Sequence, residues 1–250
     1  MRVASFNILH GRSTGDGIVD PERFRAAVQL IDADVLGLQE VDRGQSRSHG
    51  LDLTALAADA MGAKEAKFFP ALTGTPGEGW HQPRPSDPED GPAYGNALLS
   101  RLPVRSWATL RLPALPVRRP RDEPRVAIGA VLDDVTVFTT HLSYLPPWNR
   151  VQLHRLLTAI RRVPGPQLLT GDLNIAGALP RALRDWTPLV NALTFPADAP
   201  RVQLDHVLAR RCTPVVHSVQ VMELPLSDHR AVVVDLDVNS NVSVGSSGGE

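Results

Sequence analysis

The sequence contains a single cysteine, Cys212, among its 250 residues. One thiol excludes an intramolecular disulfide and also a metal site built from several thiolates, such as a zinc finger. Lysine is nearly as scarce, since only Lys64 and Lys67 occur among 26 basic residues, and 27 acidic residues bring the formal charge to -1. Because no positive field covers the whole protein, any phosphate-rich partner must be held locally.

Long apolar runs are also missing. No stretch approaches the roughly 20 residues that a membrane-spanning helix needs. The apolar N-terminal segment is interrupted at Asn7, His10 and Gly11, too early for the core of a signal peptide. We therefore expect no integral membrane segment and a cytoplasmic location, with secretion left open because a secreted enzyme can lack disulfides. A monomer is expected, although the sequence does not determine the oligomeric state.

Proline and glycine, in contrast, are abundant, with 22 and 19 copies, and 42% of the residues are hydrophobic. This composition is typical of a folded chain with many loops and a large core. We expect a single domain over residues 1–238 and a flexible polar tail over 239–250. Two proline-rich segments, 75–92 and 112–124, are predicted to be surface loops, and a role in lining a substrate cleft is the less favoured alternative.

Hydrophobic periodicity predicts short strands that alternate with a few helices. Alternating apolar residues favour a strand over 2–9, and the nearly all-apolar run 35–39 favours a strand buried on both faces. Helices are expected after the N-cap Asp20, from residue 53 to a stop at Gly62, and from Pro147. Further strands are predicted at 94–100, 104–112, 125–132, 135–140, 167–171, 203–209, 215–222 and 230–236. This mixture indicates a layered α/β or α+β domain.

Polar side chains gather where these predicted strands end. They are Asn7, Glu40, Asn96, His141, Asp172, Asn174, Asp205, Asp228 and His229. Any one of them could have a structural role, such as a turn cap at Asn7 or an Asx turn at Asp172. Together they predict one polar site, because ligands of layered α/β proteins bind in the crevice beyond the strand ends.

The residue types of this set suit a hard cation. Carboxylates and amides, without thiolates or a closely spaced histidine pair, provide the oxygen ligands that Mg²⁺ or Mn²⁺ prefers. Glu40 is the first choice as metal ligand, and Asp205 could fix the orientation of His229. A metal that neutralises developing charge, together with an aspartate that positions water, would hydrolyse a phosphoester.

Seven sequence runs occur in the order seen in the endonuclease/exonuclease/phosphatase superfamily, which the chain resembles from end to end. They are SFNILHG (5–11), LGLQEVD (36–42), YGNALLSRLPV (94–104), TTHLSY (139–144), LLTGDLNI (168–175), QLDHVL (203–208) and PLSDHRAVVVDL (225–236). The resemblance implies a DNase I-like fold of the α/β class, a four-layer α-β-β-α sandwich of two packed mixed sheets flanked by helices. It also implies hydrolysis of phosphoesters with Mg²⁺ or Mn²⁺.

The resemblance assigns metal binding to one group of residues. Glu40 in Gln-Glu-Val-Asp matches the metal-binding glutamate of the family, and Asn7 matches the amide that supports it. Asp228 matches an acid that binds metal or supports a histidine, depending on the member. Asn96 is similar to a position that is often polar and lies near the phosphate.

A second group is implied to act on the phosphate. Asp172 and Asn174 match the pair that orients the nucleophilic water and contacts the phosphate. His229 matches the histidine at the scissile phosphate, treated as a base or as a phosphate binder, and Asp205 matches its orienting carboxylate. His141 resembles the histidine proposed to donate to the phosphate or to the leaving group.

Departures from the family pattern bear on the substrate. Leu173 replaces a commoner Phe and His206 a commoner Tyr, which should tune activity rather than abolish it. The motifs look less like those of abasic-site endonucleases than like those of compact bacterial hydrolases, sphingomyelinases and DNase I-like members. The modest length and neutral charge favour a soluble nuclease or small phosphodiesterase. Phosphomonoesterase action on nucleotide or inositol phosphates, and sphingomyelinase-like action on lipids, remain alternatives.

Three further hypotheses concern partners and other classes of protein. DNA or RNA would need local phosphate contacts, which four arginines of one proline-rich segment could supply: Arg118, Arg119, Arg121 and Arg125. A serine acyl-transfer triad is discarded because the only Gly-x-Ser-x-Gly match, at 245–249, lies in the polar tail. A binding module with a decayed site is the non-enzyme alternative, and the complete set of expected site residues argues against it.

Overall fold

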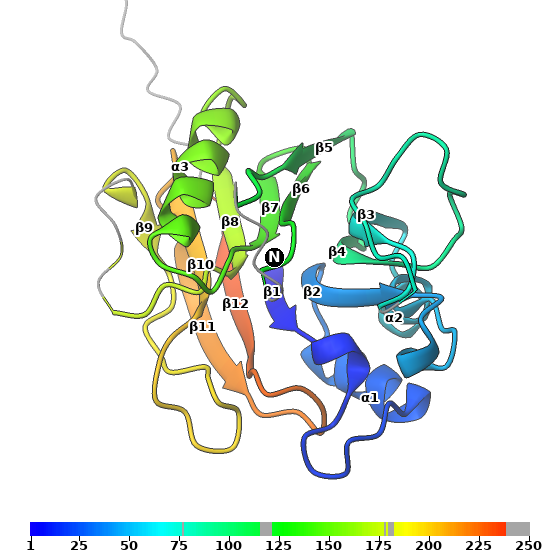
Figure 1. Ribbon diagram of the computed structural model, residues 1–250. Coiled ribbons are helices and arrows are strands. Elements are labelled where there is room, and N and C mark those ends of the chain that lie inside the picture. The colour runs from blue at the N-terminus through cyan, green and yellow to red at the C-terminus, as the bar shows by residue number, and fades with distance from the viewer. Residues whose placement is uncertain (77, 116–121, 178, 180–182, 239–250) are drawn as a thin grey trace, which may run out of the picture.

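The computed structural model describes residues 1–76, 78–115, 122–177, 179 and 183–238. Its first sheet contains β1 (Arg2–Asn7), β2 (Val35–Arg43), β3 (Glu65–Thr73), β4 (Ala93–Ser100), β11 (Val215–Met222) and β12 (Ala231–Asp237). Its second sheet contains β5 (Ser106–Arg111), β6 (Val126–Val131), β7 (Thr136–His141), β8 (Gln167–Asp172), β9 (Thr187–Pro188) and β10 (Asp205–Arg210). The strand orders are β11-β12-β1-β2-β4-β3 and β5-β6-β7-β8-β10-β9 (Figure 1).

Helices cover the outer faces of the two sheets (Figure 1). On the first sheet, α1 (Pro21–Ile31) and α2 (Leu53–Met61) bury Phe24 and Leu53 in one apolar cluster with Phe6 of β1. On the second sheet, α3 (Trp148–Ile160) buries Leu153 in a cluster with Leu169 of β8. The expected four-layer α-β-β-α architecture is therefore confirmed.

A third apolar cluster fills the space between the sheets. It joins Val3 and Val35 of the first sheet to Val137 and Leu168 of the second. The two sheets are in close contact at Gly37 of β2, where a Cβ atom would lie 2.5 Å from Thr139 Oγ1. Only glycine leaves room for the Thr139 side chain at this point, so the register between the sheets depends on it.

Local features of the sequence explain where several elements begin and end. Asp20 caps α1, its side chain accepting hydrogen bonds from the amides of Glu22 and Arg23, and Gly62 ends α2 in the left-handed conformation. Helix α3 begins at Trp148, one residue after the expected Pro147. Short 3-10 turns, η1 (Leu9–Gly11) and η2 (Ser46–Ser48), follow β1 and β2.

Strand β3 was missing from the sequence prediction. It contains Pro70, and a proline within a run argues against a central strand. The structure accommodates this proline at the edge of the first sheet, where the pairing of β3 with β4 shifts register between Pro70 and Leu72. Strand β10 begins at Asp205, two residues later than predicted.

The two predicted loops are described to different extents. Between β3 and β4 the described residues form turns and bends and one isolated bridge, Thr73 with His81, as a loop over 75–92 predicts. Of the segment 112–124, residues 116–121 lie outside the described part, and so do Arg118, Arg119 and Arg121. The tail 239–250 also lies outside it. Within the described part of the chain, no helix has the length and apolar character to cross a membrane.

We expect Gly37→Ala to destabilise the fold by about 1–3 kcal/mol, because the new methyl group would force Thr139 away from its position between the sheets. Urea unfolding monitored by circular dichroism would measure the change in midpoint. Gly15→Ala is the matched control, since the nearest atom to its new methyl lies 3.7 Å away. Equal urea midpoints for the two variants would show that the space between Gly37 and Thr139 can accept a methyl group without loss of stability.

Candidate active site

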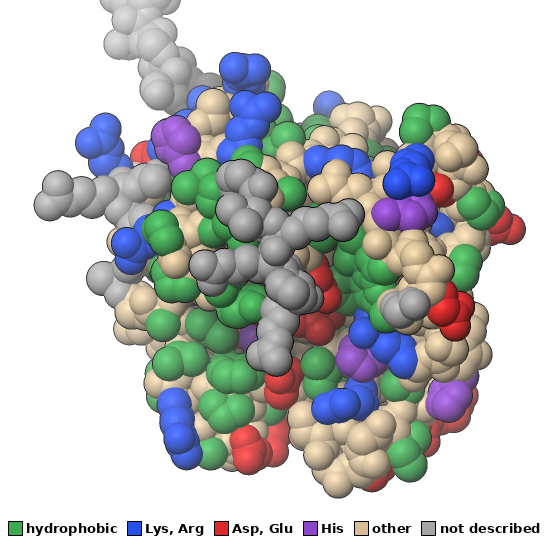
Figure 2. Space-filling view, in the orientation of Figure 1, with side chains coloured by type: hydrophobic (Ala, Val, Ile, Leu, Met, Phe, Trp, Pro, Cys, Tyr) green, Lys and Arg blue, Asp and Glu red, His purple; other side chains and the backbone are tan. Residues whose placement is uncertain are grey.

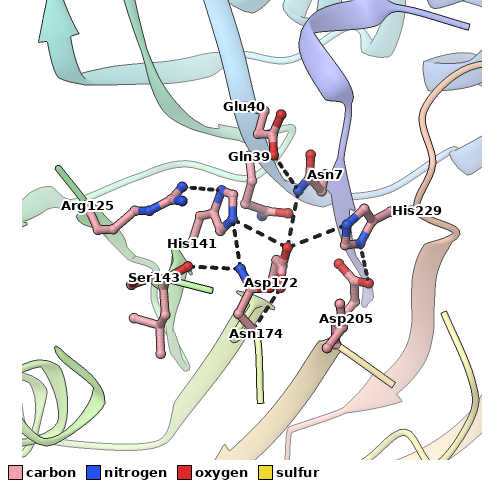
Figure 3. A network of polar contacts seen from close by, with 12 residues as sticks. Asn7, Gln39, Glu40, Arg125, His141, Ser143, Asp172, Asn174, Asp205 and His229 are labelled. Carbon is pink, nitrogen blue, oxygen red and sulfur yellow. Dashed lines mark hydrogen bonds and ion pairs between the residues drawn. The ribbon is translucent and has the colours of Figure 1, made fainter. Parts of the chain in front are cut away.

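Seven of the nine predicted site residues meet at the strand ends of the paired sheets (Figure 3): Asn7, Glu40, His141, Asp172, Asn174, Asp205 and His229. Strands β1 and β2 are parallel, with Asn7 beside Gln39, and β7 and β8 are parallel, with His141 beside Asp172. The carboxyl ends of all four strands therefore point to the same edge. The segment before β12 adds His229 to the group.

Asp172 is the centre of this network. Its Oδ2 atom lies 3.2 Å from Asn7 Nδ2, 3.4 Å from His141 Nε2 and 3.6 Å from His229 Nε2. Its Oδ1 atom accepts a hydrogen bond of 2.9 Å from the backbone N–H of Asn174. The side chain is only 1% exposed, so one buried carboxylate oxygen faces three polar side chains from separate parts of the chain.

The backbone before Asp172 permits this burial. Gly171 has φ +132, and a Cβ atom there would collide with the Thr140 carbonyl oxygen. Glycine alone allows β8 to pack this closely against β7 just before its terminal carboxylate.

Glu40 lies on an irregularity of β2. Its φ of +57 is unusual for a residue other than glycine, and the pairing of β2 with β4 shifts register between Leu38 and Val41. Such bulges bend a strand and redirect a side chain, and left-handed strain of this kind often occurs at functional sites. Here the bulge brings Glu40 Oε1 to 3.1 Å from Asn7 Nδ2.

The environment of Glu40 favours a bound cation. Burial raises the pKa of its carboxyl group, and the nearby charges of Glu123 and Asp228 raise it further, whereas Asn7 and Arg125 lower it. Among the described residues, Glu40 Oε2 accepts no hydrogen bond. A half-buried acid in acidic surroundings with a free oxygen is a suitable ligand for a divalent metal.

His229 is held as a cation by Asp205. The two side chains are buried, and His229 Nδ1 lies 2.9 Å from Asp205 Oδ2. Burial alone would lower the pKa of the imidazole, but the charge and hydrogen bond of Asp205 outweigh it and raise the pKa to about 10. At neutral pH the ring therefore carries both protons and presents Nε2–H to Asp172.

His141 is held in the opposite state by Arg125. Arg125 Nη1 lies 2.9 Å from His141 Nδ1, and a guanidinium can only donate hydrogen bonds. His141 Nδ1 is therefore the acceptor, so the proton of the neutral ring lies on Nε2. Burial and the charges of Arg125 and His229 lower the pKa of His141 well below its ordinary value. The side-chain nitrogen Nδ2 of Asn174 lies 3.1 Å from His141 Nε2, but it donates its hydrogen bond to the Leu142 carbonyl oxygen at 2.9 Å.

Two groups of side chains could hold a metal ion. One is Glu40 with its supporting Asn7. The other is Asp172, Asp205 and His229, whose ligand atoms all lie within 4.8 Å of one another, and it can hold a metal only when His229 has lost a proton. Asp205 Oδ1 is buried without a hydrogen-bond partner, which fits a site that supplies oxygen ligands. Both groups match the hard-cation chemistry of Mg²⁺ or Mn²⁺ better than a soft metal.

Two predicted residues are less closely tied to this network. The charge of Asp228 contributes to raising the pKa of both Glu40 and His229, but among the described residues its side chain makes no hydrogen bond or ion pair, so its role in metal binding stays a prediction. Asn96 is buried, and its Nδ2 atom donates to the Val126 carbonyl oxygen at 2.9 Å. No contact of the described residues links Asn96 to Asp172, so its catalytic role stays a prediction.

Some residues at the site escaped the sequence prediction. Arg125 was expected to contact nucleic-acid phosphates, but it is only 6% exposed and contacts His141. Gln39 donates to Thr139 Oγ1 at 2.9 Å, and Ser227 donates to the Asn7 carbonyl oxygen at 2.6 Å and accepts from the His229 amide. The Ser-Asp-His run was a usable indication for Ser227, because a serine two residues before a site histidine can fix its backbone.

The structure consists of two packed mixed sheets with a site of acids and histidines at their strand ends. Comparisons with known proteins identify the family that has this fold. The model of the Endonuclease/Exonuclease/phosphatase family matches residues 4–229. The chain belongs to this family. A sequence comparison with curated proteins finds no significant match.

Solved structures share the fold at low sequence identity. An endonuclease/exonuclease/phosphatase from Beutenbergia cavernae is 24% identical with a TM-score of 0.70, covering 96% of this chain and 72% of that one. A mannosyl-6-phosphatase from Bacteroides thetaiotaomicron is 16% identical with a TM-score of 0.66, covering 95% and 99%. The human Nocturnin catalytic domain with bound sulfate is 18% identical with a TM-score of 0.63, covering 96% and 93%.

The charge of Asp172 should cost stability. Burial and the charge of Asp205 raise its pKa to about 7, above the ordinary value of 3.8. A raised folded-state pKa favours folding of the protonated form, so this contribution is lost as the pH rises from about 4 through 7. We therefore expect Asp172→Asn to stabilise the metal-free protein by on the order of 1–3 kcal/mol at about pH 8, with little effect at about pH 4.

Urea unfolding at the two pH values would measure this difference. Asp205→Asn is the control, because it removes the partner of the His229 imidazolium and should destabilise the protein at both of them. A loss of stability in Asp172→Asn at the higher pH would contradict the expected sign.

The tautomer of His141 gives a separate test. In two-bond ¹H–¹⁵N spectra of imidazole-labelled protein near neutral pH, we expect His141 to be neutral with its proton on Nε2, and His229 to be protonated on both nitrogens. Arg125→Met should raise the pKa of His141 and allow the Nδ1–H tautomer, because both the charge and the donor are gone. A wild-type His141 that carries its proton on Nδ1 would refute the assignment.

Proposed function

We propose that this protein is a divalent-metal-dependent phosphoester hydrolase, acting most directly as a phosphodiesterase or nuclease. The observation that carries the proposal is the meeting of Asn7, His141 and His229 around one buried oxygen of Asp172, beside Glu40. This arrangement combines a base, several fixed donors and a candidate metal ligand within one site.

Asp172 is suited to accept a proton from the attacking water. Its pKa of about 7 lies near the working pH, where a general base is most effective. The amide of Asn174 fixes one carboxylate oxygen and leaves Oδ2 facing the site. When bound, Mg²⁺ or Mn²⁺ at Glu40 would neutralise charge on the phosphate and lower the pKa of a bound water.

The two histidines can both donate to the phosphate, with different charges. The Nε2–H of the His229 imidazolium offers a positive donor to a phosphoryl oxygen, and Asp205 stabilises that charge. The Nε2–H of His141 offers a neutral donor fixed by Arg125. Donors held in place before the reaction stabilise the charge that develops in the transition state without reorganisation.

A phosphomonoesterase is the second candidate function. This candidate is favoured by the similar structure of a mannosyl-6-phosphatase, since the match covers nearly the whole length of both chains. Sphingomyelinase-like lipid hydrolysis and action on DNA or RNA stay proposals, as do the cytoplasmic location, the monomeric state and the single domain 1–238. A non-catalytic binding module would bind a phosphoester without turnover.

Hydrolysis of bis-p-nitrophenyl phosphate and of p-nitrophenyl phosphate, with Mg²⁺ or Mn²⁺ and then with excess chelator, would test the proposal. We expect the diester to be cleaved faster and the activity to disappear with the chelator. We expect Glu40→Gln to lower kcat by about 10²-fold or more and to raise the metal concentration needed for half activity.

Glu65→Gln on β3 is the matched control, because this exposed glutamate pairs with Ser100, at the end of β4 that lies away from the site. His229→Ala and Asp172→Asn should remove most turnover while circular dichroism shows a folded protein. Activity that resists the chelator, or a Glu40→Gln variant as active as the control, would refute the metal-dependent mechanism.

A further inference from the structure

A second group of polar and aromatic side chains lies beside Glu40. Asp42, two residues further along β2, is fully buried and accepts hydrogen bonds from Arg47 Nε at 2.8 Å and from Arg47 Nη2 at 2.7 Å. Ser48 Oγ also donates to Asp42, at 3.1 Å. A buried carboxylate is costly unless it is paired, and here the pairing fixes the plane and direction of the guanidinium.

Arg47 keeps one edge of its guanidinium available. Its Nη1 atom has no hydrogen-bond partner in the described part of the chain, and its side chain is 35% exposed. An arginine that served only to neutralise Asp42 would not need an oriented, open edge. The open edge can only donate hydrogen bonds, so it suits an acceptor-rich group.

Two aromatic rings hold the guanidinium from its other sides. Arg47 Cζ lies 5.6 Å from the centroid of the Trp80 ring and 5.4 Å from that of Tyr94, and the two rings pack edge to face at 5.6 Å. Cation–π contacts of this kind restrict the arginine further. Trp80 Nε1 is buried without a partner, so a second donor at this place is unpaired.

This group is continuous with the candidate active site. Tyr94 lies opposite Asp42 in the β2–β4 pair, and burial together with the charges of Glu40 and Glu123 raises its pKa. Glu123 lies 3.8 Å from Arg125, which contacts His141. On the face that Figure 2 shows, basic and histidine side chains lie next to the acidic ones near its centre.

The backbone that leads from Asn7 to this group is strained. Leu9 and His10 have φ values of +45 and +46. Two successive bulky residues in the left-handed region are unusual and cost free energy, which is typical of functional segments. Burial, and to a smaller extent the charges of Arg47 and Arg12, lower the pKa of His10 to about 4, so its ring is neutral at neutral pH.

We propose that Arg47, with Trp80, forms a second anion subsite next to Glu40. It would bind a phosphate group that the substrate carries in addition to the scissile phosphoester. The inference rests on the proposed function and names a feature of its substrate. Because Asp42 neutralises the formal charge of Arg47, the subsite selects by the direction of its donors rather than by a strong field. The second phosphate could belong to a neighbouring nucleotide or to a small bisphosphorylated molecule, which share this chemistry.

Two substrates that differ only in one phosphate would test the subsite. Thymidine 5′-(p-nitrophenyl phosphate) is compared with the same compound that carries a 3′-phosphate. Arg47→Lys keeps a positive charge against Asp42 but loses the fork and its open edge. We expect it to raise KM about 10-fold for the 3′-phosphorylated compound, and to change KM less than about twofold for the other. Fructose 1,6-bisphosphate against fructose 6-phosphate provides the arm for small molecules.

Arg101→Lys is the matched control. Arg101 is also fixed by a carboxylate, Asp32 at 2.7 Å, but it follows the end of β4 opposite to the strand ends at the site. It should leave both KM values unchanged. If Arg47→Lys does not fold, Trp80→Phe keeps the ring and removes the N–H group, and it should weaken only the 3′-phosphorylated compound, by about 2–3-fold. The subsite would be overturned if Arg47→Lys or Trp80→Phe changed KM equally for both thymidine compounds, or for neither.

A binding measurement separates this inference from the proposed function. Inorganic pyrophosphate and inorganic phosphate are titrated into the metal-free protein by isothermal calorimetry. We expect Arg47→Lys to weaken pyrophosphate about 10-fold and phosphate less than about twofold. Absence of hydrolysis with a clear effect on pyrophosphate would refute the proposed function and support the subsite. Equal pyrophosphate affinity in wild type and variant would overturn the subsite even in an active enzyme.

Discussion

The burial of one carboxylate, that of Asp172, is the constraint on which the rest of the site depends. An acid with so little exposure requires donors on every side, and they come from both sheets and from the segment before β12. Packing of the sheets in another register would leave that oxygen without partners. The fold and the chemistry are therefore coupled, because the hydrogen bond from Asn7 of the first sheet to Asp172 of the second forms only when the sheets pack in this arrangement.

The charges of two histidines follow from their partners. Both rings face the same oxygen, yet His229 is paired with Asp205 and His141 with Arg125. An acid makes the first a cation, and a base that never loses its proton keeps the second neutral. If both rings were cations, they would repel each other across a small space. The asymmetry lets one carboxylate accept donors from both sides without an excess of positive charge.

Much of the fold could be predicted from the sequence because alternation and turn chemistry are local. The alternation over 2–9 predicted a strand, and in the structure its two faces separate Phe6, which packs under the helices, from Val3, which lies between the sheets. Strand β3 was not predictable in this way, since Pro70 is tolerated only because the strand lies at an edge. Strand ends and family motifs led to the site residues. The contact of Arg125 with His141 was not predictable, because it depends on the pairing of β6 with β7 and on burial.

The bulge in β2 also changes which face its later residues occupy. Before it, the even-numbered Leu36 and Leu38 pack under the helices, whereas beyond it the odd-numbered Val41 does so. Asp42 is thereby directed away from that apolar layer, toward Tyr94. Deleting a single residue here would restore the original parity and bury the Asp42 carboxylate among leucines and alanines. The length of β2 is thus fixed to the residue, because the positions of both Glu40 and the Asp42–Arg47 pair depend on the extra residue.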